Sequence, residues 1–531
     1  MSVTIYKALK HRILAGKKIY QSDSWVDIPS NAKMWLNGAW HKIGSGSQNQ
    51  ETIPITPEIP EQSITHENGT EPNSGNIWYI TPLGRGTKDG LSWNNAASGS
   101  MIHVILLQCS SGDSVYFSEG DYTTEYTITL PAGVNLYGGF VEEAETWSTR
   151  NGFTHKTIFT GDNTFGWMDG SSATSGQIID GFVIKNYNST ITGSNATLWN
   201  SIVNLGTASI TTAQHCVFIS APATVSTAEY CNFFYGDTTI STSANHVNVI
   251  GTNSKRPVAF LKNATNCIVA NCKSVSDTIA GFTYLIGYNS TNCIAINCIC
   301  ETLYLFYGNT TNCTAINCIG NVSEPHKANV FDSGIATNCS VINCNNFYSI
   351  FGYTNSINCL AVNCTIQGTS NKSCIFYMGA TNCTAVNCNT SNRGSIFYFE
   401  SGHGNCERKN CISWNNSGTE YAGYAITTCA GSNQDSSLAL TLGTDNSIAR
   451  FTNTGYAPAQ GVQDVGDCPN PITDPNGFSA YIESFGDWHP LSNSFLIGKG
   501  TTDSNITTDL DGVTRPSPPT IGAYEPKPIQ Q

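Results

Sequence analysis

The sequence predicts an all-β solenoid whose coils are turns of a parallel β-helix. Its most informative feature is the block Asn-Cys-x-x-x-Asn-Cys, which occurs seven times at intervals of 20 to 26 residues. A motif repeated at this period indicates stacked units that bury their apolar faces only against their neighbours. The unit is rich in Cys, Ile, Val, Thr and Phe and has no helix-forming run, so each unit is expected to consist of strands.

The paired cysteines of this block are predicted to form two structural ladders inside the coils. The first ladder contains Cys267, Cys293, Cys313, Cys339, Cys359 and Cys383, the second contains Cys272, Cys298, Cys318, Cys344, Cys364 and Cys388, and a seventh pair is Cys406 and Cys411. The chain has 21 cysteines, an odd number, and free cysteine behaves as a small buried hydrophobe. We therefore expect reduced thiols rather than disulfides. Zinc is not expected, because pairs repeated along a line do not converge on a tetrahedral site.

The residues between the cysteines predict how each coil turns. The second position after the first cysteine is small in six copies and shares that cysteine's inward direction. The third position is apolar in six copies and shares the parity of the second cysteine (Ala270, Ile296, Ile316, Ile342, Val362, Val386). We expect both sets to point inward, with a bend between them. The asparagines before the first cysteine of each copy are expected to stack amide on amide (Asn266, Asn292, Asn312, Asn338, Asn358, Asn382, Asn405).

A third ladder is predicted seven or eight residues before each first cysteine. It contains Phe260, Ile286, Phe306, Phe331, Phe351 and Phe376. Stacked rings at one level would give the solenoid a continuous core.

Strings at both ends of the predicted solenoid carry a resemblance to a known fold family. They are Trp78-Tyr79-Ile80-Thr81, Asp89-Gly90-Leu91-Ser92-Trp93, residues 112–117 and 131–140 on one side, and residues 509–515 and 521–525 on the other. In these strings the chain resembles the right-handed parallel β-helix superfamily, the pectate-lyase-like fold, over residues 76–525. Such strings are common on bacterial surface and phage β-helix proteins, and they specify fold rather than function.

The chain is predicted to divide into four parts. Residues 1–43 form a small N-terminal anchor module, in which residues 33–43 are expected to make two strands around the Asn37-Gly38 turn. Residues 44–75 are a linker rich in Pro, Ser and Glu. Residues 76–525 are the β-helix, with regular coils over 261–411 and closing coils or a cap over 412–525. Residues 526–531 are a tail.

Charge and hydropathy exclude several classes of function. The net charge is −13, but residues 1–43 carry +5, which leaves −18 for the rest. An acidic rod is not expected to bind nucleic acid, whereas the basic module could bind an acidic protein surface. No segment reaches the ~18 apolar residues of a membrane span. Residues 1–14 lack the apolar run of a secretory signal, so synthesis in the cytoplasm is expected.

Candidate chemical groups are few. Enzymes on this fold usually cleave polysaccharides, and hydrolysis needs two carboxylates about 5–9.5 Å apart. The candidates are Glu400 and Glu407, predicted to lie in one coil, and Asp332 at the level of the Phe ladder. Asp509 and Asp511 are candidate Ca²⁺ ligands, although a structural role at the end of the helix is the favoured interpretation. No cofactor motif is present, and scattered surface carboxylates are expected rather than a catalytic pair.

The sequence therefore favours a structural phage virion appendage, similar to a tail fibre or tailspike. In this hypothesis residues 1–43 attach to other virion proteins, and the β-helix binds host surface polysaccharide through Ser, Thr, Asn, Tyr and Trp side chains. By analogy with phage spikes we expect a homotrimer, made in the host cytoplasm and located on the virion. Two alternatives remain: a tailspike depolymerase, acting as a polysaccharide lyase or hydrolase, and an adhesin on the bacterial cell surface.

Overall fold

The computed structural model divides the chain into two units, residues 1–59 and residues 60–531. It describes residues 18–21, 24–27, 33–36, 39–42, 66–72, 74–141, 147–204, 206–219, 221, 223–234, 239–240, 246–247, 250–252, 263–270, 273–274, 284–300, 304–320, 328–367, 373–390, 394–398, 407–422, 426–431, 438, 440–442, 445–454 and 475–526.

The N-terminal unit contains two antiparallel hairpins. β1 (Lys18–Gln21) pairs with β2 (Ser24–Asp27). β3 (Lys33–Leu36) pairs with β4 (Ala39–Lys42), so the hairpin predicted around Asn37-Gly38 is confirmed. Lys33 lies opposite Lys42 in this register.

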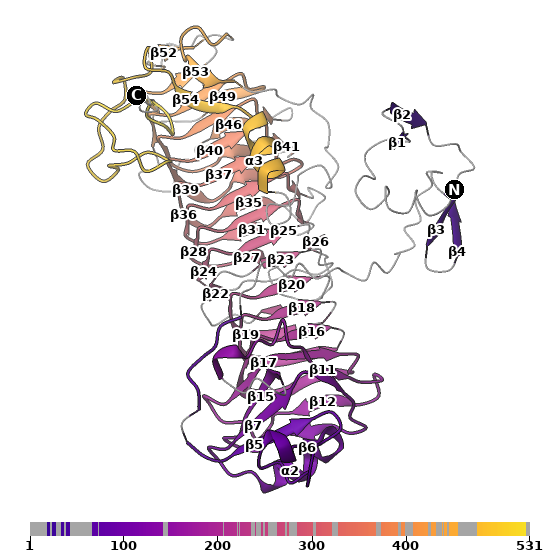
Figure 1. The fold of residues 1–531 in the computed structure, drawn as a ribbon. Coiled ribbons are helices and arrows are strands. Elements are labelled where there is room, and N and C mark those ends of the chain that lie inside the picture. The colour runs from indigo at the N-terminus through magenta and orange to yellow at the C-terminus, as the bar shows by residue number, and fades with distance from the viewer. Residues whose placement is uncertain are drawn as a thin grey trace. The chain divides into compact units, whose positions relative to one another are not determined.

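The second unit, residues 60–531, contains the predicted right-handed parallel β-helix, and the all-β fold class is confirmed. Its strands pair in parallel in three long sheets of 20, 16 and 7 strands, and the coils stack from β5 (Ile77–Thr81) to β52 (Leu440–Thr441), as Figure 1 shows. Helix α2 (Ile102–Gln108) lies at the N-terminal end of the stack, where Ile102, Ile105 and Leu106 pack into the interior. The described residues contain no helix long and apolar enough to cross a membrane.

One regular coil contributes a short strand to each sheet. β31 (Tyr304–Tyr307) belongs to the 7-stranded sheet, β32 (Thr310–Thr311) to the 20-stranded sheet and β33 (Thr314–Ile316) to the 16-stranded sheet. β34 (Ile319–Gly320) then pairs in a small 3-stranded sheet before the next coil begins.

Two of the three long sheets matter for the rest of the description, and their strands are as follows. The 7-stranded sheet contains β27 (Tyr284–Ile286), β31, β35 (Asn329–Asp332), β38 (Ser349–Phe351), β42 (Cys374–Phe376), β46 (Ser395–Tyr398) and β49 (Thr419–Ala422). In the regular coils, the 16-stranded sheet contains β25 (Ile268–Ala270), β29 (Ile294–Ile296), β33, β37 (Ser340–Ile342), β40 (Leu360–Val362), β44 (Thr384–Val386), β48 (Ile412–Trp414) and β51 (Ala430–Gly431).

Asparagine makes both corners of the 16-stranded sheet. The corner residues have left-handed backbone conformations, with φ between +51° and +55°, at Asn266, Asn292, Asn312, Asn338, Asn358, Asn382 and Asn410 before the strands and at Asn297, Asn317, Asn343, Asn363, Asn387 and Asn415 after them. Asparagine tolerates this conformation better than other side chains apart from glycine. The sequence motif is therefore a backbone requirement as well as a stacking pattern.

The corner amides stack in two ladders: the one before the first cysteines was expected, and the one before the second cysteines was not. Each Nδ2 donates to the Oδ1 one coil before: Asn292 to Asn266 at 2.9 Å, Asn312 to Asn292 at 3.0 Å, Asn317 to Asn297 at 2.8 Å and Asn363 to Asn343 at 2.7 Å. A primary amide both donates and accepts, so one residue type can continue the ladder from coil to coil.

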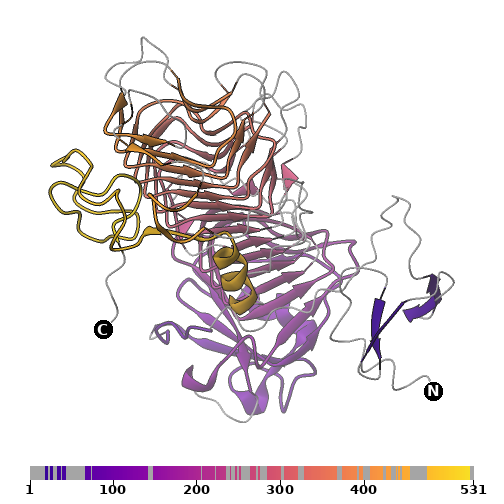
Figure 2. The ribbon, with the colours of Figure 1, turned by 90° about the horizontal axis from the view of Figure 1, so that it is seen from above.

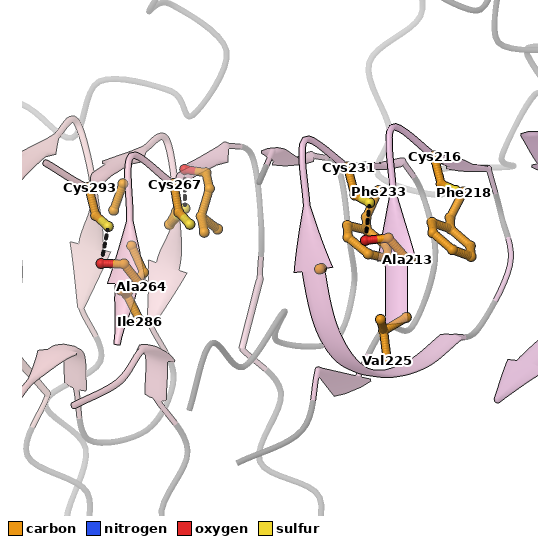
Figure 3. Close-up of a cluster of buried hydrophobic side chains, with 14 of the residues drawn as sticks. Ala213, Cys216, Phe218, Val225, Cys231, Phe233, Ala264, Cys267, Ile286 and Cys293 are labelled. Carbon is orange, nitrogen blue, oxygen red and sulfur yellow. Dashed lines mark hydrogen bonds between the residues drawn. The ribbon is translucent and has the colours of Figure 1, made fainter. Parts of the chain in front are cut away.

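The core contains stacked aromatic rings and a column of thiols. Phe306, Phe331, Phe351, Phe376 and Phe397 are paired one above another, with ring centroids 4.6–5.0 Å apart and planes within 12° of parallel. Figure 3 shows the start of the thiol column, where Cys216 and Cys231 lie above Phe218 and Phe233 and continue toward Cys267 and Cys293. Rings and sulfur atoms thus fill separate levels of one continuous interior.

The direction predicted for the third position after the first cysteine is wrong. Ile296, Ile342 and Val362 point away from the core and pack in a second apolar cluster with residues of the C-terminal segment. The side chain directions alternate regularly through the strand, and the second cysteine returns to the interior because the asparagine before it turns the chain. The corner lies at the asparagine, not between the two residues before it.

This outward apolar row explains the position of the C-terminal segment. Helix α3 (Pro475–Ser484), strand β54 (Asp487–Pro490) and residues 491–525 lie along the coils, as Figures 1 and 2 show, and Phe485, Trp488 and Ile521 pack on the row. β54 pairs with β53 (Phe451–Asn453) in an antiparallel ribbon. Residues 475–525 therefore cover the side of the helix; we call them the strap.

The seventh copy of the motif has a different register from the one its sequence suggests. Ile412 pairs with Thr384, so Cys411 stacks on Cys383 in the first ladder, and Asn410 donates to Asn382 at 2.9 Å. Asn416 takes the place of the second cysteine, and its Oδ1 accepts from the Cys388 amide at 2.6 Å. Cys272 and Cys406 lie outside the described residues.

Substitution of a corner residue should separate the two roles of asparagine. Asn317→Ala is expected to lower the free energy of unfolding by about 2–3 kcal/mol, because alanine adopts positive φ poorly and cannot continue the ladder. Asn317→Gly keeps the backbone freedom and should cost only about 1 kcal/mol. Denaturant titration checks both values. Equal losses for the two variants would contradict a backbone role for this position.

Candidate functional site

A row of tyrosines follows the ladder phenylalanines of the 7-stranded sheet. Tyr307, Tyr377 and Tyr398 come directly after Phe306, Phe376 and Phe397, and the chain then turns toward the 20-stranded sheet. We define the tyrosine strip as these three residues together with Tyr288, Tyr304 and Tyr353. Rings one coil apart come into contact at the ~4.8 Å spacing of the coils, but the coil of Asp332 separates the group of Tyr288, Tyr304 and Tyr307 from the group of Tyr353, Tyr377 and Tyr398.

The rings of the strip pack edge to face and side by side. Tyr288 and Tyr307 have centroids 5.1 Å apart at 86°, Tyr353 and Tyr377 lie 4.7 Å apart, and Tyr377 and Tyr398 lie 5.6 Å apart. Tyr288 is 42% exposed and Tyr353 is 45% exposed, whereas Tyr377 is buried between its neighbours. The strip thus offers two exposed rings on a base of packed ones.

Exposed amides lie beside the rings. Asn289 follows Tyr288 and donates to Asn263 at 3.2 Å, while Asn309 donates to Asn289 at 3.4 Å. The Oδ1 of Asn309 also accepts from the Ile335 amide at 3.0 Å. These bonds fix the amide planes at the surface, where they add hydrogen-bonding groups next to the aromatic faces.

Asp332 is the one carboxylate within the described turns that carry the strip. It is buried, and its Oδ1 accepts from the backbone amides of Ser333 and Tyr353, both at 2.9 Å. Asn329 donates to Oδ2 at 3.4 Å, and the Tyr304 side chain adds a further hydrogen bond. Burial outweighs these donors and raises the pKa of Asp332. The carboxylate therefore holds the Tyr353 turn in place from below.

Gly352 allows this close packing. A Cβ at this position would lie 2.8 Å from Asn329 Nδ2 and 3.2 Å from Asp332 Oδ1. A larger residue would displace the Asn329 amide, which donates to the carboxylate that holds the Tyr353 turn.

The predicted carboxylate candidates do not come together. Glu407 is exposed, and its backbone oxygen accepts from the Ala380 amide in the 20-stranded sheet. Glu407 lies three coils beyond Asp332, or about 14 Å along the stack, which exceeds the separation that hydrolysis needs. Glu400 lies outside the described residues.

Asp509 and Asp511, the candidate metal ligands, organise a turn. Asp509 is fully buried; its Oδ1 accepts from the amides of Asp511 and Val513, and its Oδ2 accepts from the Glu525 amide at 2.8 Å. Asp511 is half-exposed and contacts His489 Nε2 at 2.9 Å. Within the described part of the chain, no three His, Cys, Asp or Glu side chains are grouped in a way that could hold a metal ion.

The structure places the described ladder cysteines in the interior as free thiols. Their sulfur atoms donate to backbone oxygens: Cys313 to Thr311 at 3.4 Å and Cys318 to Ile316 at 3.3 Å. Burial raises the pKa of Cys318 and of Cys344, so both remain protonated near neutral pH. Such thiols are poor nucleophiles and poor metal ligands.

Two functional features escaped the sequence candidates. The tyrosine strip has a sequence signal, the repeated Phe-Tyr pair at 306–307, 376–377 and 397–398. His489 has no such signal. Asp487 lies two positions before it, but Asp511 lies 22 positions after it, and only the fold brings the three side chains together.

Comparisons with known proteins find likeness only at the level of structure. No family model and no curated protein matches this sequence. Among solved structures, pectate lyase Pel9A aligns with 88% of this chain and 99% of its own at 15% identity and a TM-score of 0.23. A PL6 alginate lyase in complex with a trisaccharide aligns with 73% of this chain and 91% of its own, at 10% identity and a TM-score of 0.27. Tailspike protein 3 of bacteriophage CBA120 aligns with 64% of this chain and 62% of its own, at 12% identity and a TM-score of 0.28. These likenesses concern the fold alone.

Alkylation of the native protein should distinguish the ladder thiols from the surface. Iodoacetamide is expected to leave Cys318, Cys344 and Cys364 unmodified at pH 8, because they are buried and protonated, and to modify them after unfolding. Cys109 is half-buried, and burial raises its pKa to about 12. Its modification should therefore be slow and should accelerate about tenfold per pH unit. Peptide mapping by mass spectrometry measures both, and ladder modification in the folded state would contradict this assignment.

Proposed function

We propose that this protein is a glycan-binding appendage of a phage particle. The β-helix would bind host surface polysaccharide through the tyrosine strip, while residues 1–43 attach to other virion proteins. The observation that carries the proposal is the strip itself: exposed rings and fixed amides along successive coils. The apolar face of a tyrosine can stack on a sugar ring while its hydroxyl and the nearby amides hydrogen-bond sugar hydroxyls.

The arrangement of the strip supports an extended ligand. Two groups of rings, Tyr288, Tyr304 and Tyr307 and then Tyr353, Tyr377 and Tyr398, lie on either side of the coil of Asp332, so a chain of sugars running along the stack meets two sets of contacts. The rings are held by contacts with one another and by Asp332 below Tyr353, so little conformational entropy is lost on binding.

Electrostatics supports a neutral ligand. The described residues of the strip and its turns, 284–290, 304–311, 328–337, 347–357, 373–381 and 394–398, contain no Lys, Arg or His. Asp332 and the net charge of −13 make the surroundings negative. A polysaccharide rich in uronic acids would be repelled, whereas a neutral one would not.

Attachment through the N-terminal unit rests on its charge and its separateness. Residues 1–43 carry +5 within an acidic chain, and β3 and β4 form a hairpin in a unit distinct from the β-helix. A basic hairpin fits an acidic surface on a virion protein. The proposed location is the virion, after synthesis in the host cytoplasm. The proposed assembly is a homotrimer, which light scattering of the intact protein tests; a monomer would exclude it.

Substitution of an exposed ring should weaken glycan binding. Tyr353→Ala is expected to reduce affinity for a neutral host polysaccharide about tenfold, because one stacking contact is lost without change to the core. Tyr230→Ala is the matched control: Tyr230 is 46% exposed and stacks on His215 far from the strip. Isothermal titration with neutral and uronic-acid polysaccharides measures both variants. Equal loss in the two variants, or preference for the acidic polymer, would contradict the proposed site.

An assay for turnover tests the depolymerase alternative. Incubation with host polysaccharide should release no reducing ends, because the described strip has a single carboxylate whereas hydrolysis uses two, and no unsaturated uronates, because the same turns have no Lys, Arg or His to act as the base of a lyase. Release that disappears in Asp332→Asn while binding persists would instead identify an enzyme.

A further inference from the structure

The imidazole of His489 has a carboxylate at each nitrogen. Its Nδ1 lies 2.5 Å from Asp487 Oδ1, and its Nε2 lies 2.9 Å from Asp511 Oδ2. A carboxylate accepts hydrogen bonds and does not donate them, so both contacts require protons on both ring nitrogens. The ring is largely buried and lies against Tyr524, with centroids 4.0 Å apart. The geometry is that of an imidazolium between two anions.

This ion cluster joins separate parts of the strap. Asp487 and His489 lie on β54, Asp511 lies on the turn that Asp509 organises, and Tyr524 comes from the closing residues. Glu483, at the end of α3, lines the same cavity. The sheet side of this cavity supplies Ile342, Leu360 and Val362, which do not titrate. Among the described residues that line this cavity or contact the ring, the charged groups are therefore acidic and belong to the strap.

The cavity beside the cluster separates the strap from the β-helix. Its volume is about 500 Å³, and it is bounded by the outward row of the 16-stranded sheet on one side and by Phe485, Trp488 and Tyr524 on the other. Movement of β54 would enlarge this cavity and expose the apolar row. A change in the charge of the cluster would therefore alter the packing between β54 and the outward apolar row.

A second set of contacts holds the strap without His489. Arg515 forms a buried ion pair with Glu525 at 2.8 Å and donates to Asn358 Oδ1 at 3.2 Å, in the first amide ladder. The Ala523 amide donates to Thr384 Oγ1 at 2.9 Å. These bonds do not depend on an imidazole, so they fix residues 515–525 whatever the charge of His489, whereas β54 carries the cluster itself and is otherwise held by its pairing with β53 and by apolar packing.

We propose that the strap is latched to the β-helix by the imidazolium of His489 and that its first part, residues 475–490, loosens when the ring loses a proton. The neutral ring can donate at one nitrogen only, so one of the two bonds from the ring to a carboxylate is lost. Asp487 and Asp511 then repel each other without a cation between them. Loosening opens the cavity and uncovers Ile342, Leu360 and Val362, while the Arg515 contacts keep the strap attached.

The direction of the pH dependence follows from the groups around the ring. Burial opposes protonation, but the hydrogen bonds to Asp511 and Asp487 outweigh it and raise the pKa of His489. When the pKa of a group is higher in the folded than in the unfolded protein, its protonation stabilises the folded state. For histidine this stabilisation is complete below the unfolded pKa of about 6.5, and it is lost as the pH rises through the folded pKa. The strap is therefore closed in mildly acidic solution and loosens on the alkaline side.

Hydrogen exchange of the full-length protein tests the latch. Protection factors of peptides covering residues 484–491 are expected to fall about tenfold between pD 5.5 and pD 8.5, while peptides from residues 338–366 stay protected. His489→Gln should show the low protection at both values. Asp511→Asn removes one anion and should move the transition to lower pH, which keeps the test valid where His489→Gln fails to fold.

His155→Gln is the matched control, because His155 also contacts a carboxylate, Glu119 at 3.2 Å, but lies in the N-terminal coils. It should leave the transition unchanged. A wild-type strap with constant protection would overturn the proposal. So would a transition that persists in folded His489→Gln or stays in place in Asp511→Asn.

Discussion

The left-handed asparagine corner is the constraint on which the rest of this structure depends. Each coil can turn sharply at both ends of the 16-stranded sheet because Asn312, Asn317 and their equivalents accept positive φ. The same side chains then bond from coil to coil, so backbone geometry and stacking select one residue. With the corners fixed, strand length is fixed at three residues, and the alternation within it places cysteine and a small residue inside and an apolar residue outside. The outward apolar row, and the strap that covers it, follow from that alternation.

The repeat made the fold predictable from the sequence. The predictions that were wrong have physical causes. Spacing, composition and the cysteine and phenylalanine levels were sufficient for a parallel β-helix, because a solenoid needs only contacts between neighbouring coils. The direction of Ile342 was mistaken because apolar character was taken to mean interior, whereas this residue is buried by a segment more than a hundred positions later. The seventh copy was misplaced because Cys406 and Cys411 fit the motif by chance, while pairing follows Asn410. Local patterns do not encode such long-range coverage.

The site was less predictable than the fold. Asp332 was a candidate by its level in the coil, yet its surroundings make it a support for the Tyr353 turn, and Glu407 lies too far away to assist it. The exposed rings were visible in the sequence only as interleaved aromatics; their alignment needed the register of the 7-stranded sheet. The faces of the β-helix differ in what covers them. The 16-stranded sheet is covered by the strap, and the turn after the 7-stranded sheet carries exposed aromatic and amide groups.

The covered row has a consequence for how the chain reaches its final state. Ribosomes deliver the coils first and residues 475–525 last, so during synthesis a line of isoleucine, valine and leucine side chains faces water on an already stacked column. Exposed apolar rows on strands favour association between chains. The time between completion of the coils and arrival of the strap is therefore the period in which this protein is most exposed to aggregation, and the last tenth of the sequence acts as its built-in protection.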